Sequence, residues 1–162
     1  LLQKSGATLV QGEDPCMLPK AGKNATELAG MEQAHQKDAV AMCRFLAWLD
    51  RQVEKHAEAD EASLAEQLAR FREEQDNYIE PSFSTISALG PNAAMCHYNH
   101  TQSTPREFGQ DGLYLVDSGG HYLEGTTDIT RTIKVGEVSD EMKRQFTRVL
   151  QGHIALDRVR FP

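Results

Sequence analysis

The sequence lacks the long apolar run that a membrane-spanning helix requires. Its uninterrupted apolar runs extend over only a few residues, whereas about 20 are needed to cross a bilayer. Cysteine is also scarce: Cys16, Cys43 and Cys96 are widely spaced and odd in number, and no Cys-x-x-Cys pair occurs. This pattern fits reduced thiols better than a disulfide framework or a cysteine metal site. We therefore expect a soluble, cytoplasmic protein without a membrane partner.

Clustered positive charge is lacking as well. The 162 residues include 24 acidic and 17 basic side chains, for a formal net charge of −7, and the basic residues are spread among the acidic ones. Domains that bind nucleic acid usually carry a basic patch or stripe, so we expect no nucleic-acid partner. Since 40% of the residues are apolar, the chain is long enough to bury the core of one ordinary domain.

Two helices are predicted in the first half of the chain. Asn24, followed three residues later by Glu27, resembles a capping box, and apolar residues then recur at helical spacing over residues 25–54. Asp60 can cap a second helix that ends near Glu74, and we expect the charged run 70–74 to face solvent. The buried stripe of the first helix is expected at Leu28, Met31, Ala39, Met42, Leu46, Leu49 and Val53.

Strands are predicted mainly in the second half. Ser, Thr, aromatic and β-branched residues become common after Asn77, which is typical of strands, and Gly90-Pro91-Asn92 predicts a turn. Two helices, several strands joined by hairpins and a final helix capped by Ser139 indicate an α+β fold, with helices packed on a mainly antiparallel sheet. The expected strands are 7–10, 84–88, 93–98, 113–117, 121–123 and 127–135, with a loop at 100–111. The expected inner face of the last helix is Met142, Phe146, Val149, Ile154 and Val159.

The stretch 112–132, GLYLVDSGGHYLEGTTDITRT, places Asp117 at the end of an apolar strand and Asp128 eleven residues later. If the flanking strands form a hairpin with its midpoint near Tyr122 and Leu123, residues whose numbers sum to about 245 lie opposite one another, and the two acids face each other. Like charges at that separation are destabilising unless one is protonated or a cation lies between them. Carboxylate oxygens surrounded by threonine hydroxyls favour a hard divalent ion such as Mn²⁺.

Other interpretations stay open at this point. Asp117 is also a plausible turn residue before Ser-Gly-Gly, and Asp128 a plausible solvated strand residue, while a shared-proton acid pair lacks the expected Asp-Thr-Gly context. Two carboxylates are too few ligands for a metal. His97 ends a predicted strand and precedes the loop that leads back to Asp117, so it is a candidate either for the site or for packing. No Gly-x-Ser-x-Gly elbow occurs, which argues against a serine hydrolase of that type.

These segments resemble the Xaa-Pro aminopeptidases (aminopeptidase P) of peptidase family M24, whose catalytic domain has the pita-bread (creatinase/aminopeptidase) fold. The resemblance is carried by LVDSGG at 115–120, by GTTDITRT at 125–132 and by GPNAAMCHY at 90–98. Methionine aminopeptidases share the spacing of the two acids and an upstream histidine, but not the surrounding residues. Prolidase is a nearer alternative.

The resemblance implies that Asp117 is a ligand of one Mn²⁺ and that Asp128 bridges the two Mn²⁺ ions of the complete enzyme. It further implies that His97 is a catalytic residue that contacts the substrate near the scissile bond. The implied substrate is a peptide with proline in second position, and the implied reaction is removal of the first residue by a metal-bridging hydroxide. The further ligands of the family, a His in a Gly-His-Gly segment and two Glu, have no counterpart in this sequence.

We therefore expect residues 1–23 to be the end of a preceding domain and a linker, and residues 24–162 to be the first half of a pita-bread catalytic domain. Such an incomplete fold is expected to be inactive alone. Its expected partner is a second copy, in a homodimer through the catalytic domain, or the missing downstream half. The alternative is a non-catalytic pita-bread module that binds proteins; the presence together of Asp117, Asp128 and His97 favours the enzyme.

Overall fold

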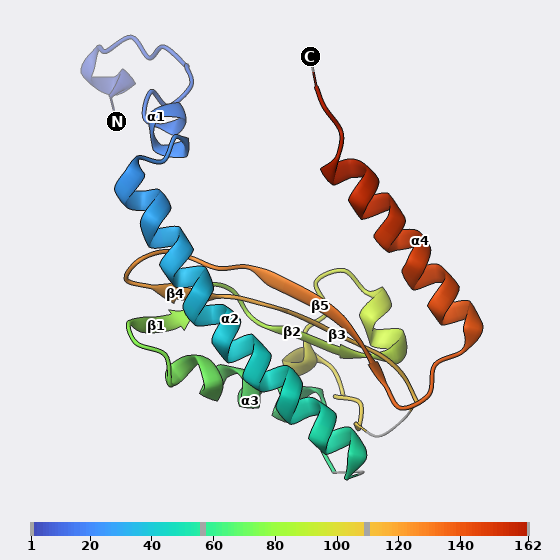
Figure 1. Ribbon diagram of the computed structural model, residues 1–162. Helices are drawn as coiled ribbons and strands as arrows, with labels where there is room; N and C mark the ends of the chain where they lie inside the picture. Colours follow the sequence, from blue (N-terminus) through green and yellow to red (C-terminus); the bar gives the residue numbers. More distant parts are fainter. Residues whose placement is uncertain (1, 56–57, 109–110, 162) are drawn as a thin grey trace.

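The computed structural model describes residues 2–55, 58–108 and 111–161, and two of its helices pack on antiparallel strands (Figure 1). The expected α+β class is confirmed. No helix in these ranges is long and apolar enough to cross a membrane. In chain order the elements are the 3₁₀ helix η1 (Gln3–Ser5), α1 (Met17–Ala21), α2 (Ala25–Glu54), α3 (Glu61–Glu73), β1 (Tyr78–Pro81), β2 (Ile86–Leu89), the 3₁₀ helices η2 (Gly90–Ala94) and η3 (His100–Gln102), β3 (Gly112–Ser118), β4 (Gly120–Tyr122), β5 (Ile129–Val135) and α4 (Asp140–Asp157).

The helices α2 and α3 begin at the residues that the sequence predicts. The Asn24 side chain accepts a hydrogen bond from the Glu27 backbone N–H at 2.9 Å, and the Glu27 carboxylate accepts one from the Asn24 N–H at 2.8 Å. Asp60 and Ser63 form the same reciprocal pair at the start of α3. Each pair satisfies two N–H groups that have no partner within the helix, so local sequence fixes where both helices begin.

The core lies between these two helices and one face of the three-stranded sheet β2-β3-β5. Alternate residues of β3 are buried, as a strand with one covered face requires. Full burial of one such large apolar side chain contributes roughly 1.5–3 kcal/mol. The core residues are Met42, Phe45 and Leu49 of α2, Leu64 and Leu68 of α3, Leu89 of β2, Tyr114 and Val116 of β3, Val135 of β5, and Phe108 of the loop before β3.

The buried stripe of α2 differs from the predicted one. Leu28 is 52% exposed and Ala39 is exposed, although Met42 and Leu49 are buried as expected. Asp38 is fully buried on this stripe because it pairs with Arg72 of α3. The expectation that the charged run 70–74 faces solvent is therefore wrong for Arg72, which is 2% exposed. The full buried set is Ala34, Asp38, Ala41, Met42, Phe45 and Leu49.

Two of the predicted strands are wrong. Residues 7–10 have no regular secondary structure, and residues 93–98 form the end of η2 and a turn. Gly90 has φ +54 and is followed by Pro91, so the chain leaves the sheet in a helical turn there. The other predicted strands are present with shifted ends. The predicted loop 100–111 contains η3, and its residues 109 and 110 lie outside the described ranges.

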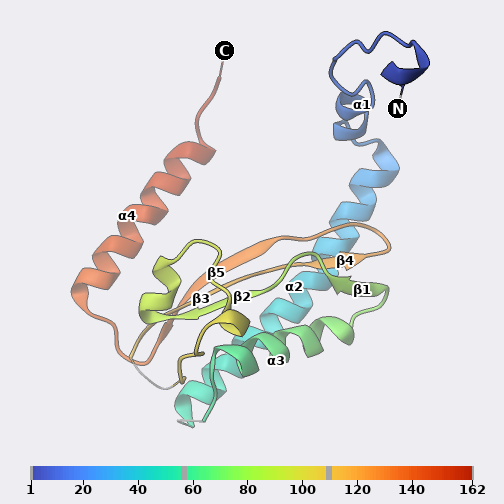
Figure 2. The same ribbon diagram turned by 180° about the vertical axis from the view of Figure 1, so that it is seen from behind.

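The helix α4 begins where predicted, but its apolar face is not buried. The Ser139 hydroxyl accepts from the Met142 N–H at 3.2 Å. Figures 1 and 2 show α4 standing apart from α2 and α3, and none of its residues is buried. The predicted inner face is therefore wrong for this chain: Phe146 is 45% exposed and Val149 is 73% exposed.

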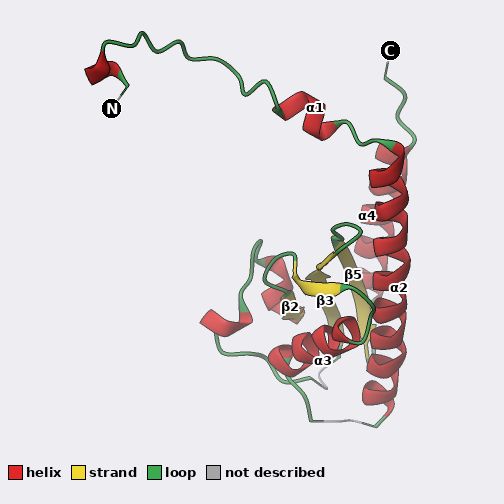
Figure 3. Ribbon diagram, turned by 90° about the vertical axis from the view of Figure 1, so that its left-hand side faces the viewer, coloured by secondary structure: helices red, strands yellow, loops and turns green. Residues whose placement is uncertain are grey.

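The first part of the chain contributes nothing to the core. Residues 2–29 are exposed, and Figure 3 shows α1 and the segment before it extending away from α2. The boundary expected after residue 23 stays a prediction, since a long exposed segment is compatible with more than one division into domains.

Candidate metal centre

The strands β3, β4 and β5 belong to one long hairpin that carries both candidate acids. Gly112 pairs with Val135 and Ser118 with Ile129, so the residue numbers of each pair sum to 247 rather than to the expected 245. At the tip, Tyr122 and Gly125 exchange backbone hydrogen bonds of 2.8 and 3.2 Å. The register is therefore shifted by two residues from the predicted one.

Asp117 lies opposite Thr130, and the prediction that it directly faces Asp128 is wrong. The Thr130 hydroxyl donates to Asp117 Oδ1 at 2.7 Å. Because side chains alternate between faces with a period of two, a shift of two residues leaves Asp128 on the face of Asp117. The two acids are diagonal neighbours, a relationship in which Cα atoms are typically about 7–8 Å apart.

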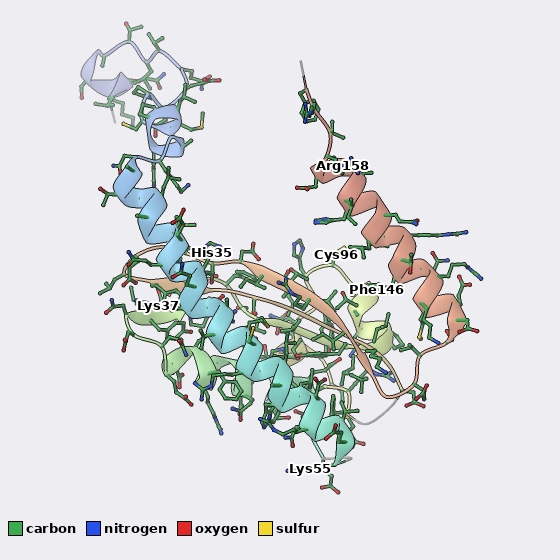
Figure 4. All side chains as sticks on the ribbon, viewed as in Figure 1. His35, Lys37, Lys55, Cys96, Phe146 and Arg158 are labelled. Atoms are coloured by element: carbon green, nitrogen blue, oxygen red, sulfur yellow. The ribbon has the colours of Figure 1, made fainter. Side chains whose placement is uncertain are left out.

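The face of the sheet that carries these acids is open. Leu113 and Asp117 are partly exposed, while Asp128 and Thr130 are exposed. A groove of about 580 Å³ separates this face from α4, and its lining includes Leu113, Thr130 and Phe146. Figure 4 shows Phe146 on the side of α4 that is turned toward the sheet. Both carboxylates are thus accessible from the side that α2 and α3 leave uncovered.

On the opposite face, a buried carboxylate collects donors from α3 and from the hairpin. Asp38, which is 0% exposed, accepts from Arg72 Nε at 2.6 Å and Nη2 at 3.2 Å. It also accepts from Tyr122 Oη at 3.0 Å and from Thr127 Oγ1 at 2.7 Å. Burial, together with the negative charge of Asp38, raises the pKa of the Tyr122 hydroxyl, which therefore remains a protonated donor at neutral pH.

A second buried carboxylate, Glu61, holds the segment that carries His97. Glu61 is the first residue of α3 and is 0% exposed. Burial and the hydrogen bond to Glu61 raise the pKa of Tyr98 to about 12. The donors to Glu61 are Leu89 N at 2.6 Å, Asn92 Nδ2 at 3.0 Å, Tyr98 Oη at 2.6 Å and Arg106 N at 3.0 Å. Glu61 thus ties the end of β2, η2 and the residue after His97 to α3.

His97 itself lies in the turn after η2 and not at the end of a strand. It is exposed and has φ +57, a conformation that is uncommon for residues other than glycine, although histidine is among those that adopt it more often. Within the described ranges, no group of three or more His, Cys, Asp or Glu is arranged to hold a metal. The structure therefore does not gather His97, Asp117 and Asp128 into a complete metal site.

The two aspartates are the type of ligand that a hard divalent cation prefers, but they are too few to hold one by themselves. Carboxylate oxygens are the ligands that Mg²⁺, Ca²⁺ and Mn²⁺ prefer, and Thr130 provides the hydrogen bond that commonly orients such a ligand. Two carboxylates nevertheless leave most positions around such an ion unfilled. Residues other than the described ones would have to complete the site.

Threonine hydroxyls around the acids were expected, and Thr130 does bond to Asp117, whereas Thr127 bonds to Asp38 instead; sequence reasoning missed Asp38 and Glu61. A signal for Asp38 was present, because it lies four residues after Ala34 and four before Met42 on the buried stripe, and a buried acid is expected to have a partner. Glu61 gave no such signal, since an acid in the first turn is common in any helix.

The chain belongs to metallopeptidase family M24, whose family model matches residues 29–162. Among individual members it is similar to Xaa-Pro aminopeptidase ApepP of Drosophila melanogaster, with 44% identity over 153 residues that make up 94% of this chain and 25% of the relative. It is also similar to Xaa-Pro aminopeptidase 2 of Homo sapiens, with 48% identity over 148 residues, 91% of this chain and 22% of the relative.

A solved structure gives the same result. The chain superimposes on X-prolyl aminopeptidase from Caenorhabditis elegans, described as a cytosolic enzyme with a di-nuclear active site, with a TM-score of 0.87 and 39% identity over 92% of this chain and 24% of that one. The resemblance to Xaa-Pro aminopeptidases and the pita-bread fold class are confirmed. The chain spans about a quarter of the length of these relatives.

Proposed function

We propose that this chain contributes two metal-ligand carboxylates to a dinuclear manganese Xaa-Pro aminopeptidase. The reaction is hydrolysis of the peptide bond between the first residue and a proline in second position. The observation that carries the proposal is that Asp117 and Asp128 share one open face of the hairpin, in a chain 44–48% identical to Xaa-Pro aminopeptidases. The di-nuclear site of the Caenorhabditis elegans relative supports two ions, and the hardness of carboxylate oxygen supports Mn²⁺.

In this proposal Asp117 would be a ligand of one ion and Asp128 would be a ligand shared by both. Bound Mn²⁺ supplies Lewis acidity toward the scissile carbonyl and lowers the pKa of water. The hairpin register holds the two carboxylates at a fixed spacing, and the Thr130 hydroxyl orients one oxygen of Asp117. His97 contacts the substrate near the scissile bond; its exposure supports this role over packing.

The chain alone is proposed to be inactive, since two carboxylates do not make a complete site. Residues 24–162 then form the first half of the catalytic domain, and residues 1–23 the end of what precedes it. The absence of any buried residue in α4 supports a covering partner, either the downstream half of the domain or a second copy. The cytosolic relative supports a cytoplasmic location.

The test is an assay of this chain together with the downstream half, with and without Mn²⁺. Release of the first residue is expected from a peptide with proline in second position, and not from the same peptide with alanine there. Asp128→Asn is expected to lower kcat/KM by roughly 100-fold or more, while Asp50→Asn, at an exposed position of α2, leaves it unchanged. A protein that cleaved neither peptide but bound a protein partner would support the non-catalytic module instead.

A further inference from the structure

We propose that Asp38 is a positioning residue for the metal centre and that it acts, through Thr127, on the peptide unit that carries Asp128. The inference rests on the proposed function, because it concerns the carboxylate proposed to bridge the two ions. Asp38 lies on α2, on the opposite side of the hairpin from the open face, so it does not itself contact metal or substrate.

Thr127 connects the buried carboxylate to both arms of the hairpin. It is 1% exposed, and its hydroxyl donates to Asp38 Oδ2 at 2.7 Å while it accepts from the Gly120 N–H at 2.9 Å. The Thr127 N–H also donates to the Gly120 carbonyl at 2.9 Å. The Thr127 hydroxyl thus links Asp38 of α2 to Gly120, on the arm of the hairpin that follows Asp117. Thr127 itself is the residue directly before Asp128.

The peptide unit between Thr127 and Asp128 is held from a second side. The Ser82 hydroxyl donates to the Thr127 carbonyl oxygen at 2.9 Å. Gly119 packs against the same carbonyl so closely that an added Cβ would overlap both this oxygen and the Ser82 hydroxyl. With its carbonyl held by Ser82 and its preceding side chain held by Asp38, this peptide unit has little freedom to rotate, which fixes the direction in which the Asp128 side chain leaves the backbone.

The charge on Asp38 makes it a strong anchor. Hydrogen bonds to a carboxylate are roughly twice as strong as those between neutral groups, and the bidentate pair with Arg72 fixes the orientation of the carboxylate between α2 and α3. A buried ion pair is weak evidence for a stabilising role, because well-packed apolar residues of similar volume are often equally stable. An apolar pair could not hold the Thr127 hydroxyl, and this requirement accounts for a charge at a 0% exposed position.

The test compares Mn²⁺ affinity with stability in the full chain joined to its downstream half. Free Mn²⁺ is followed by electron paramagnetic resonance, and stability by urea unfolding without metal. Thr127→Val keeps the shape of the side chain and removes the hydroxyl, and a loss of Mn²⁺ affinity of roughly 10–100-fold is expected. Thr127→Ser restores the hydroxyl and is expected to bind within about threefold of wild type.

The matched control is Tyr114→Phe, which also removes one buried hydroxyl, bonded to Ser87 at 2.8 Å. It is expected to lower stability as Thr127→Val does and to leave Mn²⁺ affinity unchanged. If Thr127→Val bound Mn²⁺ as tightly as the wild type, or if Tyr114→Phe lost as much Mn²⁺ affinity as Thr127→Val, this inference would be wrong and the proposed function would be unaffected. Failure of the wild-type protein to bind Mn²⁺ would overturn the proposed function and this inference with it.

A milder variant covers the case in which Thr127→Val does not fold. Ser82 is only partly buried, and Ser82→Ala removes the donor to the Thr127 carbonyl without leaving a buried charge unpaired. A loss of Mn²⁺ affinity of roughly threefold or more is expected, without a comparable loss in Ser84→Ala, at a neighbouring exposed position. Unchanged affinity in Ser82→Ala would contradict the proposal that this peptide unit sets the direction of Asp128.

Discussion

Asp117 and Thr130 lie opposite each other on β3 and β5, and the Thr130 hydroxyl donates to Asp117 Oδ1 at 2.7 Å. The residue directly opposite the first acid is therefore a hydrogen-bond donor and not the second acid. The like-charge contact expected from the sequence is replaced by a diagonal relationship on the same face, in which the repulsion is weaker because the separation is larger. At this diagonal separation, the coexistence of the two carboxylates does not require a cation between them.

Thr130→Val removes this donor and keeps the β-branched shape. Mn²⁺ affinity is expected to fall roughly 10-fold, because the Asp117 oxygen loses the group that orients it. The free energy of unfolding should change by less than about 0.5 kcal/mol, since the side chain is exposed. Thr132→Val is the matched control: Thr132 lies on the same face opposite Leu115. An equal loss of affinity in both variants would contradict the assigned role of Thr130.

Glu61→Gln tests the buried carboxylate that holds the segment that carries His97. Each of its two oxygens accepts a hydrogen bond from a backbone N–H group, one from Leu89 and the other from Arg106. In the glutamine variant, the side-chain NH₂ group replaces one of these acceptors and must face a donor. A loss of about 2–4 kcal/mol in the free energy of unfolding is expected from urea titration. Glu66→Gln makes the same change at an exposed position of α3, and a loss below about 0.5 kcal/mol is expected there. Similar losses would show that the hydrogen bonds of Glu61 contribute little.

The ends of the helices could be predicted because they depend on neighbours in the sequence. The capping boxes at Asn24 and at Asp60 each involve a residue three positions further along the chain. Contacts within one helical turn can therefore be predicted from neighbouring residues in the sequence. The hairpin register could not be predicted in the same way. The register depends on the turn at residues 123 and 124 and on the packing of Gly119 against Thr127. The prediction used the alternation of apolar and polar residues, and a shift of two residues leaves this alternation unchanged.

The sequence predicted that the two acids lie on one face and that threonine hydroxyls surround them, but it did not predict the buried ion pair behind the hairpin. Asp117 and Asp128 share a short segment, and even the wrong register places them on one face. Asp38 and Arg72 are 34 residues apart and meet only when α2 and α3 pack, so helical periodicity read one helix at a time assigns Arg72 to solvent. The exposed apolar face of α4 has the same origin: the pattern shows that a face is apolar and does not show what covers it.

Arg72→Met tests how strongly the buried pair is coupled to folding. The change leaves the Asp38 carboxylate buried with only neutral donors, Tyr122 and Thr127, and removal of one partner from a buried ion pair typically costs about 3–5 kcal/mol. The free energy of unfolding should fall by this amount in urea titration. Arg70→Met, at an exposed position of the same helix, should change it by less than about 1 kcal/mol. A small loss in Arg72→Met would mean that Asp38 is solvated in solution.

The acid dependence of stability is expected to include a contribution from Glu124, at the tip of the hairpin. Its carboxylate accepts from Lys37 Nζ at 2.6 Å and from Asn77 Nδ2 at 2.6 Å, and these bonds, that from Lys37 first, hold the pKa of Glu124 below its ordinary value of 4.5. A group whose pKa is lowered on folding stabilises the folded state above its unfolded pKa. This stabilisation is lost as the pH falls from the unfolded pKa through the folded one.

Lys37→Met removes the first of these bonds, so the free energy of unfolding of the variant should fall less than that of the wild type as the pH falls below the ordinary pKa of 4.5. Urea unfolding at a series of pH values measures this difference. Lys55→Met removes a positive charge from the exposed end of the same helix, far from Lys37 (Figure 4), and should keep the wild-type slope. If Lys37→Met kept that slope as well, the bond from Lys37 would not be the source of the lowered pKa of Glu124.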